Sequence, residues 1–199
     1  MLDSSKSYVY DSRKIKKGDN YICLPKGEQY IKEALENGAA DVIHLSRKEF
    51  AIEANKYFDY PTKKVTLIGI TGTNGKTSVA NFVAQLLEGF GYNVLVIGTI
   101  NNALTTPESW ETLMLINQHI ENGGTHVVLE VSSHGIDQYR VYGFDFDVKC
   151  LTNITQDHLD YHKTFEDYLK TKNSIFNKAK VKIGNEANKH VISDVDIFF

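Results

Sequence analysis

The sequence has few cysteines and no long apolar run. Its two cysteines, Cys23 and Cys150, lack the spacing of a disulfide framework or a metal site, and each lies in an apolar context that is typical of a buried thiol. No apolar stretch approaches the roughly 20 residues of a membrane-spanning helix. The first ten residues lack the basic and then apolar layout of a secretion signal. These features predict a cytoplasmic protein without a membrane span.

The chain also lacks an excess of charge of one sign. Its 199 residues contain 22 Lys and Arg against 25 Asp and Glu, which gives a net charge of -3. Proteins that bind nucleic acid usually present a basic surface, so the charge balance predicts no nucleic-acid partner. The length suffices for one sizeable core or for two modest domains.

The first sixty residues contain short elements. Strands are expected over residues 20–24 and 41–45, and a helix between them carries apolar side chains near residues 31–35 and ends at Gly38. The stretch 57–64 breaks this periodicity and contains a proline. We therefore expect a domain boundary near residue 62, with one domain over residues 1–62 and a second over residues 63–199.

The second part alternates strands and helices. Buried strands are expected over residues 65–70, 94–97, 127–131 and 148–151. A helix start is expected at residues 106–108, where Thr106 would cap the helix. The apolar end of the chain resembles a strand without partners. One helix has a predicted apolar face that consists of Val79, Phe82, Val83, Leu86, Leu87 and Phe90. The alternation predicts an α/β fold with a parallel sheet.

A glycine-rich loop connects the first of these strands to the following helix. Its sequence, GTNGKTS over residues 72–78, ends in the Gly-Lys-Thr of phosphate-binding loops, although the common spacing would place a glycine at Ile70. Backbone N–H groups and the helix dipole suit phosphate at such a position. Lys76 would reach the outer phosphates and Thr77 would bind a magnesium ion. The alternative is a tight glycine turn with an exposed lysine, but the flanking strand and helix favour a nucleoside triphosphate site.

Glu130 comes at the end of a predicted buried strand. Ligands of open α/β sheets bind at the carboxyl ends of the strands, where a carboxylate could complete a magnesium site with the loop hydroxyl. The alternative is a surface glutamate. The small polar residues that follow it, in the run SSHG, favour a binding site.

A third polar cluster precedes the last predicted helix. Asp157, His158, Asp160 and His162 follow a strand end, where a second metal could lie. Lys172 falls on the apolar stripe of the helix, with residues 165, 168, 169, 175 and 176. A lysine on a buried face is costly unless it is paired, neutral or modified. Alternatively, its side chain extends to the surface.

Four segments, in this order, resemble the Mur ligases of peptidoglycan synthesis: GTNGKT, TTPE, EVSSHG followed by Q-x-R, and TN-x-T-x-DHLDYH. Within that family the sequence is most similar to the UDP-N-acetylmuramoyl-tripeptide synthetases, and the likeness spans residues 11–176. The glycine spacing of the loop is typical of the family. The resemblance implies an N-terminal UDP-sugar-binding domain and a central ATPase domain, of which this chain would lack the final part. A third domain, which binds the incoming amino acid, would be absent.

The resemblance also implies the cofactors and their ligands. Residues Gly72, Thr73, Asn74, Gly75, Lys76, Thr77 and Ser78 would bind ATP. Thr77 and Glu130 would hold one Mg²⁺, and His158 with a carbamylated Lys172 would serve a second. Carbamylation would explain a lysine on a buried face, since it converts the amine into a carboxylate that can bind metal. Lys76, His158 and Lys172 are the expected catalytic residues.

The resemblance implies a substrate as well, a UDP-N-acetylmuramoyl-dipeptide to which a diamino acid is joined through an acyl phosphate. Ser12 would contact the uridine nucleotide. The remaining substrate contacts would be Thr105, Thr106, Ser132, Gln138 and Arg140. A planar guanidinium such as that of Arg140 suits a carboxylate or phosphate.

Two other classes of function compete with this interpretation. The chain could be an incomplete module that binds ATP and the UDP-sugar without ligating them. It could also be another phosphate-loop enzyme, but a GTPase would need an Asn-Lys-x-Asp motif, which the sequence lacks. A folylpolyglutamate synthetase would not be expected to contain the Asp-Ser-Arg stretch or the EVSSHG segment.

Overall fold

The N-terminal part of the chain forms a small parallel sheet. The computed structural model describes residues 2–175, 179–189 and 195–199, and its first three strands pair in the order β1-β2-β3. A capping box begins helix α2: Ser46 Oγ accepts from the Glu49 N–H while the Glu49 carboxylate accepts from the Ser46 N–H. The elements are β1 (Tyr8–Val9), η1 (Ser12–Lys14), β2 (Asn20–Cys23), η2 (Glu28–Tyr30), α1 (Ile31–Glu36), β3 (Asp41–His44), α2 (Arg47–Tyr57) and η3 (Pro61–Lys63).

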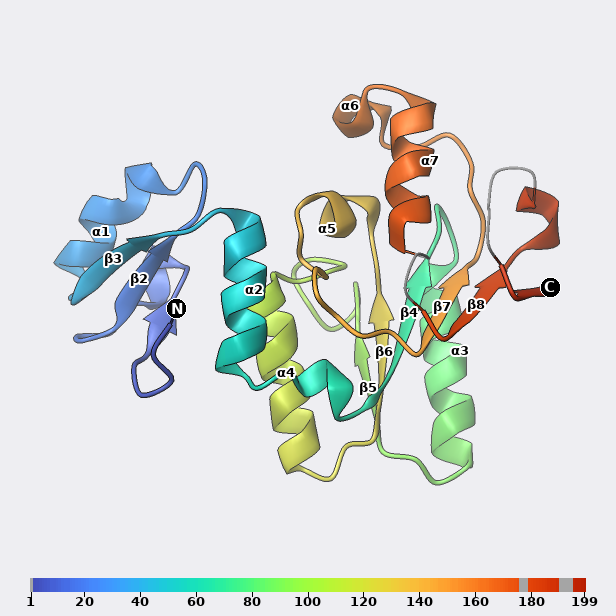
Figure 1. Ribbon diagram of the computed structural model, residues 1–199, viewed down its shortest axis with the longest axis horizontal. Coiled ribbons are helices and arrows are strands. Elements are labelled where there is room, and N and C mark those ends of the chain that lie inside the picture. The colour runs from blue at the N-terminus through green and yellow to red at the C-terminus, as the bar shows by residue number, and fades with distance from the viewer. Residues whose placement is uncertain (1, 176–178, 190–194) are drawn as a thin grey trace.

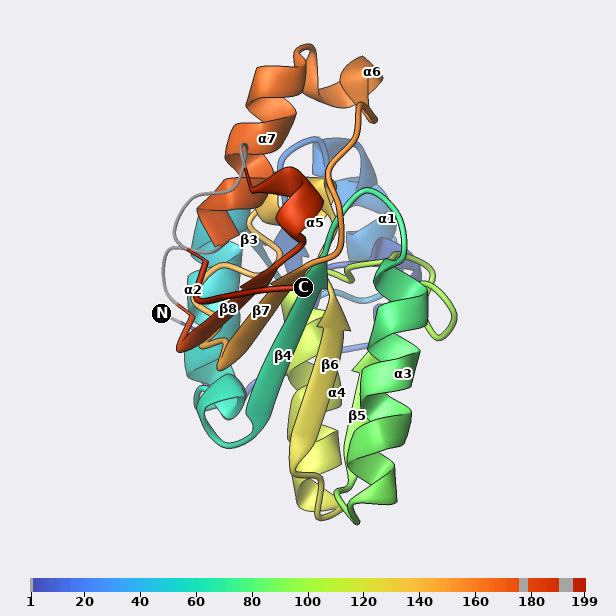
Figure 2. The ribbon, with the colours of Figure 1, turned by 90° about the vertical axis from the view of Figure 1, so that its right-hand side faces the viewer.

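The rest of the described chain forms a six-stranded sheet in the order β5-β6-β4-β7-β8-β9. All of its pairs are parallel. Figure 2 shows these strands side by side, with α6 and α7 beyond their carboxyl ends. The elements are β4 (Thr66–Thr71), α3 (Lys76–Gly89), β5 (Val94–Ile97), α4 (Ser109–Glu121), β6 (His126–Glu130), α5 (Ser133–Asp137), β7 (Val148–Leu151), α6 (Leu159–His162), α7 (Phe165–Ser174), β8 (Val181–Gly184), η5 (Glu186–Asn188) and β9 (Ile197–Phe198).

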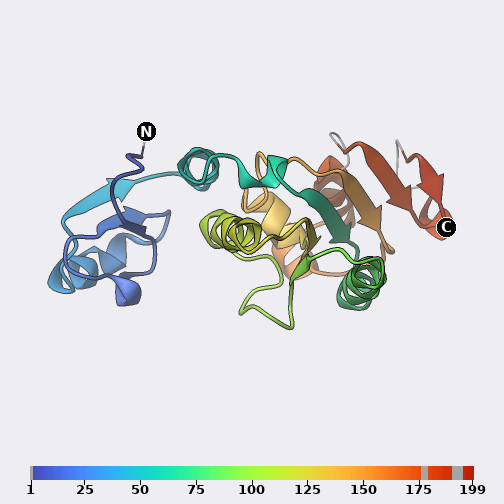
Figure 3. The same ribbon diagram turned by 90° about the horizontal axis from the view of Figure 1, so that it is seen from below.

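Both faces of the large sheet are covered, which explains the continuous apolar runs of its central strands. On β6, Val127 and Leu129 pack on the face with α4, whereas Val128 packs on the face with α3. Figure 3 shows that α3 lies far from the N-terminal sheet. Helices α2 and α4 lie side by side between the two sheets (Figure 1).

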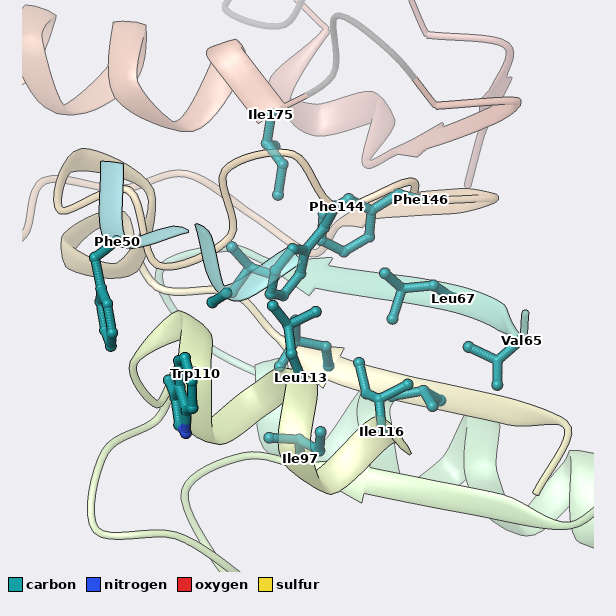
Figure 4. Packing of buried hydrophobic residues seen from close by; sticks show 14 of the residues in the cluster. Phe50, Val65, Leu67, Ile97, Trp110, Leu113, Ile116, Phe144, Phe146 and Ile175 are labelled. Carbon is teal, nitrogen blue, oxygen red and sulfur yellow. The ribbon is translucent and has the colours of Figure 1, made fainter. Parts of the chain in front are cut away.

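One apolar cluster joins the two sheets. It contains Phe50 of α2, Trp110 and Leu113 of α4, and Leu67 of β4, all buried. The rings of Phe50 and Trp110 are stacked with centroids 6.0 Å apart and an interplanar angle of 6°. Figure 4 shows this pair beside the aliphatic side chains of the large sheet. The N-terminal sheet therefore shares a core with the large sheet.

The expected α/β fold with parallel sheets is confirmed, and most expected strands occur within one or two residues of their predicted bounds. The expected helix start at Thr106 is wrong: the helix begins at Ser109, because the Thr106 hydroxyl donates to the Glu130 carbonyl instead of capping α4. The end of the chain is not a strand without partners, since β9 pairs with β8. Phe176, expected on the stripe of α7, lies outside the described residues.

The predicted apolar face of α3 is only half correct. Val79, Val83 and Leu87 pack toward the sheet, with Ala80 and Ala84. Three residues of that face instead point to solvent and are 63%, 65% and 80% exposed, namely Phe82, Leu86 and Phe90.

Two further expectations concern cysteines and membranes. Cys23 and Cys150 are both free and buried, as predicted. Within the part of the chain that the structure describes, no helix combines the length and the hydropathy that are required to cross a membrane.

Candidate functional site

Three strands of the large sheet end at the same level, and the candidate site lies at this edge. Ile70 on β4 is the register partner of Glu130 on β6, and Thr71 is the partner of Leu151 on β7. The glycine-rich loop after β4, the Glu130 carboxylate and the segment after β7 are therefore neighbours. Because the strands are parallel, this edge is where an open α/β sheet binds ligands.

The conformation of the loop requires glycine at two positions. Gly72 and Gly75 have φ angles of 148° and 82°, in the region that side chains disfavour. A Cβ on Gly72 would collide with the Thr152 hydroxyl. The displaced glycines therefore serve a loop that lies tightly against the segment after β7.

That segment also binds the loop by hydrogen bonds. The Thr73 N–H donates to the Asn153 carbonyl (2.9 Å), and the Asn74 N–H donates to Asn153 Oδ1 (3.0 Å). Thr152 Oγ1 and Asn153 Nδ2 both donate to the Asn74 carbonyl, at 2.6 and 3.0 Å. The loop is thus held in place before any ligand arrives.

Two lysines converge on the loop. Lys76 Nζ donates to the Gly72 and Thr73 carbonyls, both at 3.0 Å, and Lys172 Nζ donates to the same Gly72 carbonyl at 2.8 Å. Burial lowers the pKa of Lys76. Lys172 is only 1% exposed, and its burial, together with the charge of Lys76, lowers its pKa to about 7. Lys172 therefore does not extend to the surface.

The Glu130 carboxylate is buried and accepts hydrogen bonds from both sides of the site. Thr77 Oγ1 donates to Oε2 (2.8 Å), while the Thr99 N–H donates to Oε1 (3.1 Å) and Thr99 Oγ1 to Oε2 (3.3 Å). A side chain at Gly98 would overlap this carboxylate. A hydroxyl and a carboxylate are oxygen donors of the kind that Mg²⁺ prefers, so Thr77 and Glu130 fit one magnesium ion.

A cavity of about 240 Å³ opens above these groups. It is lined by the glycine-rich loop, by two residues after β5 and by the last residue of β6, namely Thr73, Asn74, Gly75, Lys76, Thr77, Ser78, Thr99, Thr105 and Glu130. Of the seven residues that were predicted to bind the nucleotide, six line this cavity and Gly72 does not. The cavity combines a cation, a helix N-terminus and a carboxylate, which is a suitable set for a phosphate chain with a divalent cation.

The Tyr168 ring contacts both His158 and Lys172. The φ of His158 is 53° and its N–H donates to Asp157 Oδ1 (2.8 Å). The Tyr168 ring is 6.3 Å from the His158 ring and 5.0 Å from Lys172 Nζ, and its hydroxyl lies 2.8 Å from Thr73 Oγ1. Within the described residues, no hydrogen bond joins His158 to Lys172.

The expected second metal site is not assembled from ordinary side chains. Among the residues of known placement, no three His, Cys, Asp or Glu side chains converge as metal ligands. An unmodified Lys172, buried beside the ammonium of Lys76, supplies no carboxylate. His162 is also buried, its ring 5.4 Å from that of Tyr168, and burial lowers its pKa.

The residues expected at the muramoyl-peptide end form two connected groups. Thr106 Oγ1 accepts from the Ser132 N–H (2.9 Å) and donates to the Glu130 carbonyl (2.9 Å). Thr105 Oγ1 lies 3.0 Å from Thr99 Oγ1, which itself contacts Glu130. Thr106 therefore contacts the main chain of Glu130, and Thr105 is linked to the Glu130 carboxylate through Thr99.

The second group consists of Gln138 and Arg140. Arg140 Nη2 donates to Gln138 Oε1 (2.7 Å), and Nη1 donates to the Thr106 carbonyl (2.8 Å). Gln138 Nε2 in turn donates to the Tyr161 hydroxyl (3.2 Å). The structure thus brings all five residues into one network with Glu130.

Ser12 lies apart, in the N-terminal sheet. Its hydroxyl donates to the Glu33 carboxylate, and the residue is 5% exposed. It lines a separate cavity of about 430 Å³, and the other lining residues are Tyr10, Asp11, Arg13, Tyr21, Tyr30 and Glu33. Aromatic faces, a guanidinium and carboxylates in one hollow are suited to a base with polar edges.

The part of the chain that forms this site matches a known protein family. A family model described as the Mur ligase middle domain matches residues 70–195, from the end of β4 to a point just before β9. The chain belongs to the Mur ligase family. The resemblance seen in the sequence is thereby confirmed.

Several Mur ligases are similar over nearly the whole chain. The UDP-N-acetylmuramoyl-L-alanyl-D-glutamate--2,6-diaminopimelate ligase of Clostridium botulinum is 38% identical over 208 residues, 88% of this chain and 43% of the relative. A solved structure of a ligase with the same name aligns with a TM-score of 0.77 at 28% identity, covering 93% of this chain and 44% of the other. The MurF ligase of Thermotoga maritima, solved with ADP, aligns with a TM-score of 0.68 at 22% identity, covering 100% of this chain and 51% of the other. The chain spans less than half the length of the curated relative from Clostridium botulinum.

Three contributors to this Mur ligase site were not predicted as site residues. Thr99 comes two residues after the end of β5, and Glu130 is the last residue of β6, so the position of Thr99 near a strand end was an available signal. Asn153 lies in the quoted TN-x-T segment but was given no role. Tyr168 was assigned to the apolar stripe of its helix, and its hydroxyl contact with the loop depends on tertiary packing that periodicity does not contain.

Proposed function

We propose that this chain forms the ATP-binding and UDP-sugar-binding part of a ligase that joins diaminopimelate to UDP-N-acetylmuramoyl-L-alanyl-D-glutamate. The observation that carries the proposal is the hydrogen-bonded pair of Thr77 and Glu130 beside Lys76 at the N-terminus of α3. This set suits a triphosphate with magnesium. The names of the relatives supply the substrate and the amino acid.

The proposed reaction has two steps. The γ-carboxylate of D-glutamate attacks the γ-phosphorus of ATP, which gives an acyl phosphate and ADP. The amine of the incoming amino acid then attacks the acyl carbon, phosphate leaves with the bonding electron pair, and the amine loses a proton. Lys76 would neutralise charge on the transferred phosphoryl group, as expected of a cation placed in a protected site. Magnesium, held by Thr77 and Glu130, would add further charge stabilisation.

In this proposal the side chain of Lys172 is converted to a carbamate. Its neutral amine, available because the pKa is about 7, would attack carbon dioxide and release a proton to give a carbamate. The product is an anion beside Lys76, and a second magnesium ion could then be held by this carbamate and His158. The buried position of Lys172 above the loop supports the modification over a free ammonium.

The N-terminal cavity would hold the uridine nucleotide. Ser12 and Tyr30 line it, and Tyr30 presents an exposed ring on which a base could stack. Thr105, Thr106, Ser132, Gln138 and Arg140 would contact the rest of the substrate. We further propose a division into two domains near residue 62, one for each nucleotide.

Calorimetry of the 199-residue chain tests the proposal. Lys76→Ala should weaken Mg-ATP binding by about tenfold to a hundredfold, the usual range for losing a hydrogen bond to a charged group. Lys170→Ala, which removes an exposed lysine from α7, is the matched control and should bind as the wild type does. Equal ATP affinity in all three proteins would refute the site. Formation of the tripeptide product would separate a complete ligase from a module that only binds.

A further inference from the structure

Glu108 is a buried carboxylate that two arginines share. Arg47 Nη1 donates to both of its oxygens, at 2.7 and 2.9 Å, and Arg140 Nε lies 3.4 Å from Oε1. The side chains of Glu108 and Arg140 are 12% and 11% exposed. Because these side chains are so little exposed, water and salt screen their charges only weakly. Each charge therefore constrains the positions of the others.

Helix capping does not explain this glutamate. Glu108 occupies the N-cap position of α4, where a carboxylate can accept from the first N–H groups of the helix. It makes no such bond. Its side chain turns to the guanidinium groups instead. A buried ion pair by itself is weak evidence for stability, which leaves a role in orienting its partners.

The partner that bears on binding is Arg140. Its guanidinium is fixed by the Thr106 carbonyl at Nη1 and by Gln138 Oε1 at Nη2. Nε is buried and makes no hydrogen bond within the described part of the chain, so Glu108 holds that edge by charge alone. Without the carboxylate, the guanidinium could rotate about its remaining contacts.

The first turn of α4 also contacts a residue that lines the N-terminal cavity. Arg47 is the first residue of α2, which follows the N-terminal sheet. One turn after Glu108, Glu111 accepts from the Tyr10 hydroxyl (3.2 Å), and Tyr10 lines the cavity that contains Ser12. Burial, followed by the charge of Glu111, raises the pKa of Tyr10, which keeps this hydroxyl a donor. Glu108 and Glu111 therefore connect Arg140 with a residue that lines the N-terminal cavity.

Resting on the proposed function, we propose that Glu108 is a positioning residue for the UDP-muramoyl-dipeptide. It orients Arg140 toward an anionic group of the substrate and, through Arg47, fixes that guanidinium relative to the N-terminal sheet. The residue touches no reacting atom. Its effect should appear in the binding of the sugar nucleotide and not in the binding of ATP.

The test compares Glu108→Gln with Glu121→Gln, a matched change at the exposed end of the same helix. Glu108→Gln should bind UDP-N-acetylmuramoyl-L-alanyl-D-glutamate about tenfold or more weakly, as expected for loss of a charge-assisted contact, with unchanged ATP affinity. Glu121→Gln should change neither. In addition, the Nε–H NMR signal of Arg140 should shift and exchange faster in Glu108→Gln. That readout needs no ligand.

Three results would each overturn the proposal. They are an Arg140 signal that does not change, an affinity for the sugar nucleotide that does not change, and an equal loss of affinity for ATP. If Glu108→Gln does not fold, Glu108→Asp replaces it, because its charge is kept but withdrawn by one methylene and the same loss is expected. If the wild type binds no sugar nucleotide, the proposed function fails, and the Arg140 signal still decides whether Glu108 orients that side chain.

Discussion

At the scale of single residues, Lys172 shows how burial lowers the pKa of an amine. Its amine donates to a carbonyl of the loop and faces the Tyr168 ring, and the nearby Lys76 carries the same charge. Each of the first two contacts tolerates an ammonium, but desolvation dominates and lowers the pKa to about 7. The same burial that lowers the pKa of the amine should make the unmodified side chain costly for folding.

This cost should depend on pH. The pKa of Lys172 is about 7 in the folded chain and near 10.5 when unfolded, so the unfolded state binds more protons between these values. The stability contributed by this position is lowest below pH 7 and recovers as the pH rises. In buffer free of metal and bicarbonate, Lys172→Met should therefore be more stable than the wild type at pH 6.5. The advantage should shrink by roughly 2–3 kcal/mol at pH 9 in urea unfolding.

Lys170→Met is the control for this prediction, because Lys170 is exposed on the same helix and should show no pH-dependent advantage. An advantage of Lys172→Met that is equal at both pH values would contradict the low pKa. With ¹³C-bicarbonate added, the wild type should gain a carbamate carbon signal that Lys172→Met lacks.

At the scale of elements, α3 has two apolar sides, of which only one packs. Phe82, Leu86 and Phe90 recur at helical spacing but are exposed, whereas Val83 faces the sheet. Phe82→Gln with Leu86→Gln should therefore change the free energy of unfolding by no more than about 0.5 kcal/mol, as for surface substitutions. Val83→Ala should cost more, because it removes packing atoms. A double variant that is as destabilised as Val83→Ala would show that the outer stripe is covered in solution.

The same helix shows what sequence can and cannot predict. Periodicity predicted the helix and its start at the loop, because both depend on local spacing. It could not rank Phe82 against Val83, since both are apolar and only the position of the sheet separates them. Likewise, Thr77 and Glu130 were predicted as partners from strand-end logic, but Glu108 was assigned to a helix start. Its arginine partners lie 61 and 32 positions away in sequence and are joined only by the fold.

At the scale of the whole molecule, the two sheets share a core, so we expect them to unfold together. Trp110 is the only tryptophan, and it contacts Phe50, Tyr57 and Phe58 of the N-terminal part, with ring centroids 6.0, 4.6 and 5.0 Å away. Its fluorescence therefore reports on the junction of the sheets, while circular dichroism reports on all of the elements. In the wild type the two signals should give a single coincident transition.

Phe50→Ala should break this cooperativity. Phe50 is 1% exposed and stacks on Trp110, so its removal leaves a cavity at the junction and should cost about 3–5 kcal/mol. Because the large sheet keeps its own strands, tryptophan fluorescence should then change at lower urea than circular dichroism. Phe82→Ala, which removes an exposed ring of the same type, should leave both transitions where they are. A fluorescence transition that precedes circular dichroism already in the wild type would mean that the junction is weaker than its packing indicates. Arg47 and Arg140 would then not be held together by Glu108 across it.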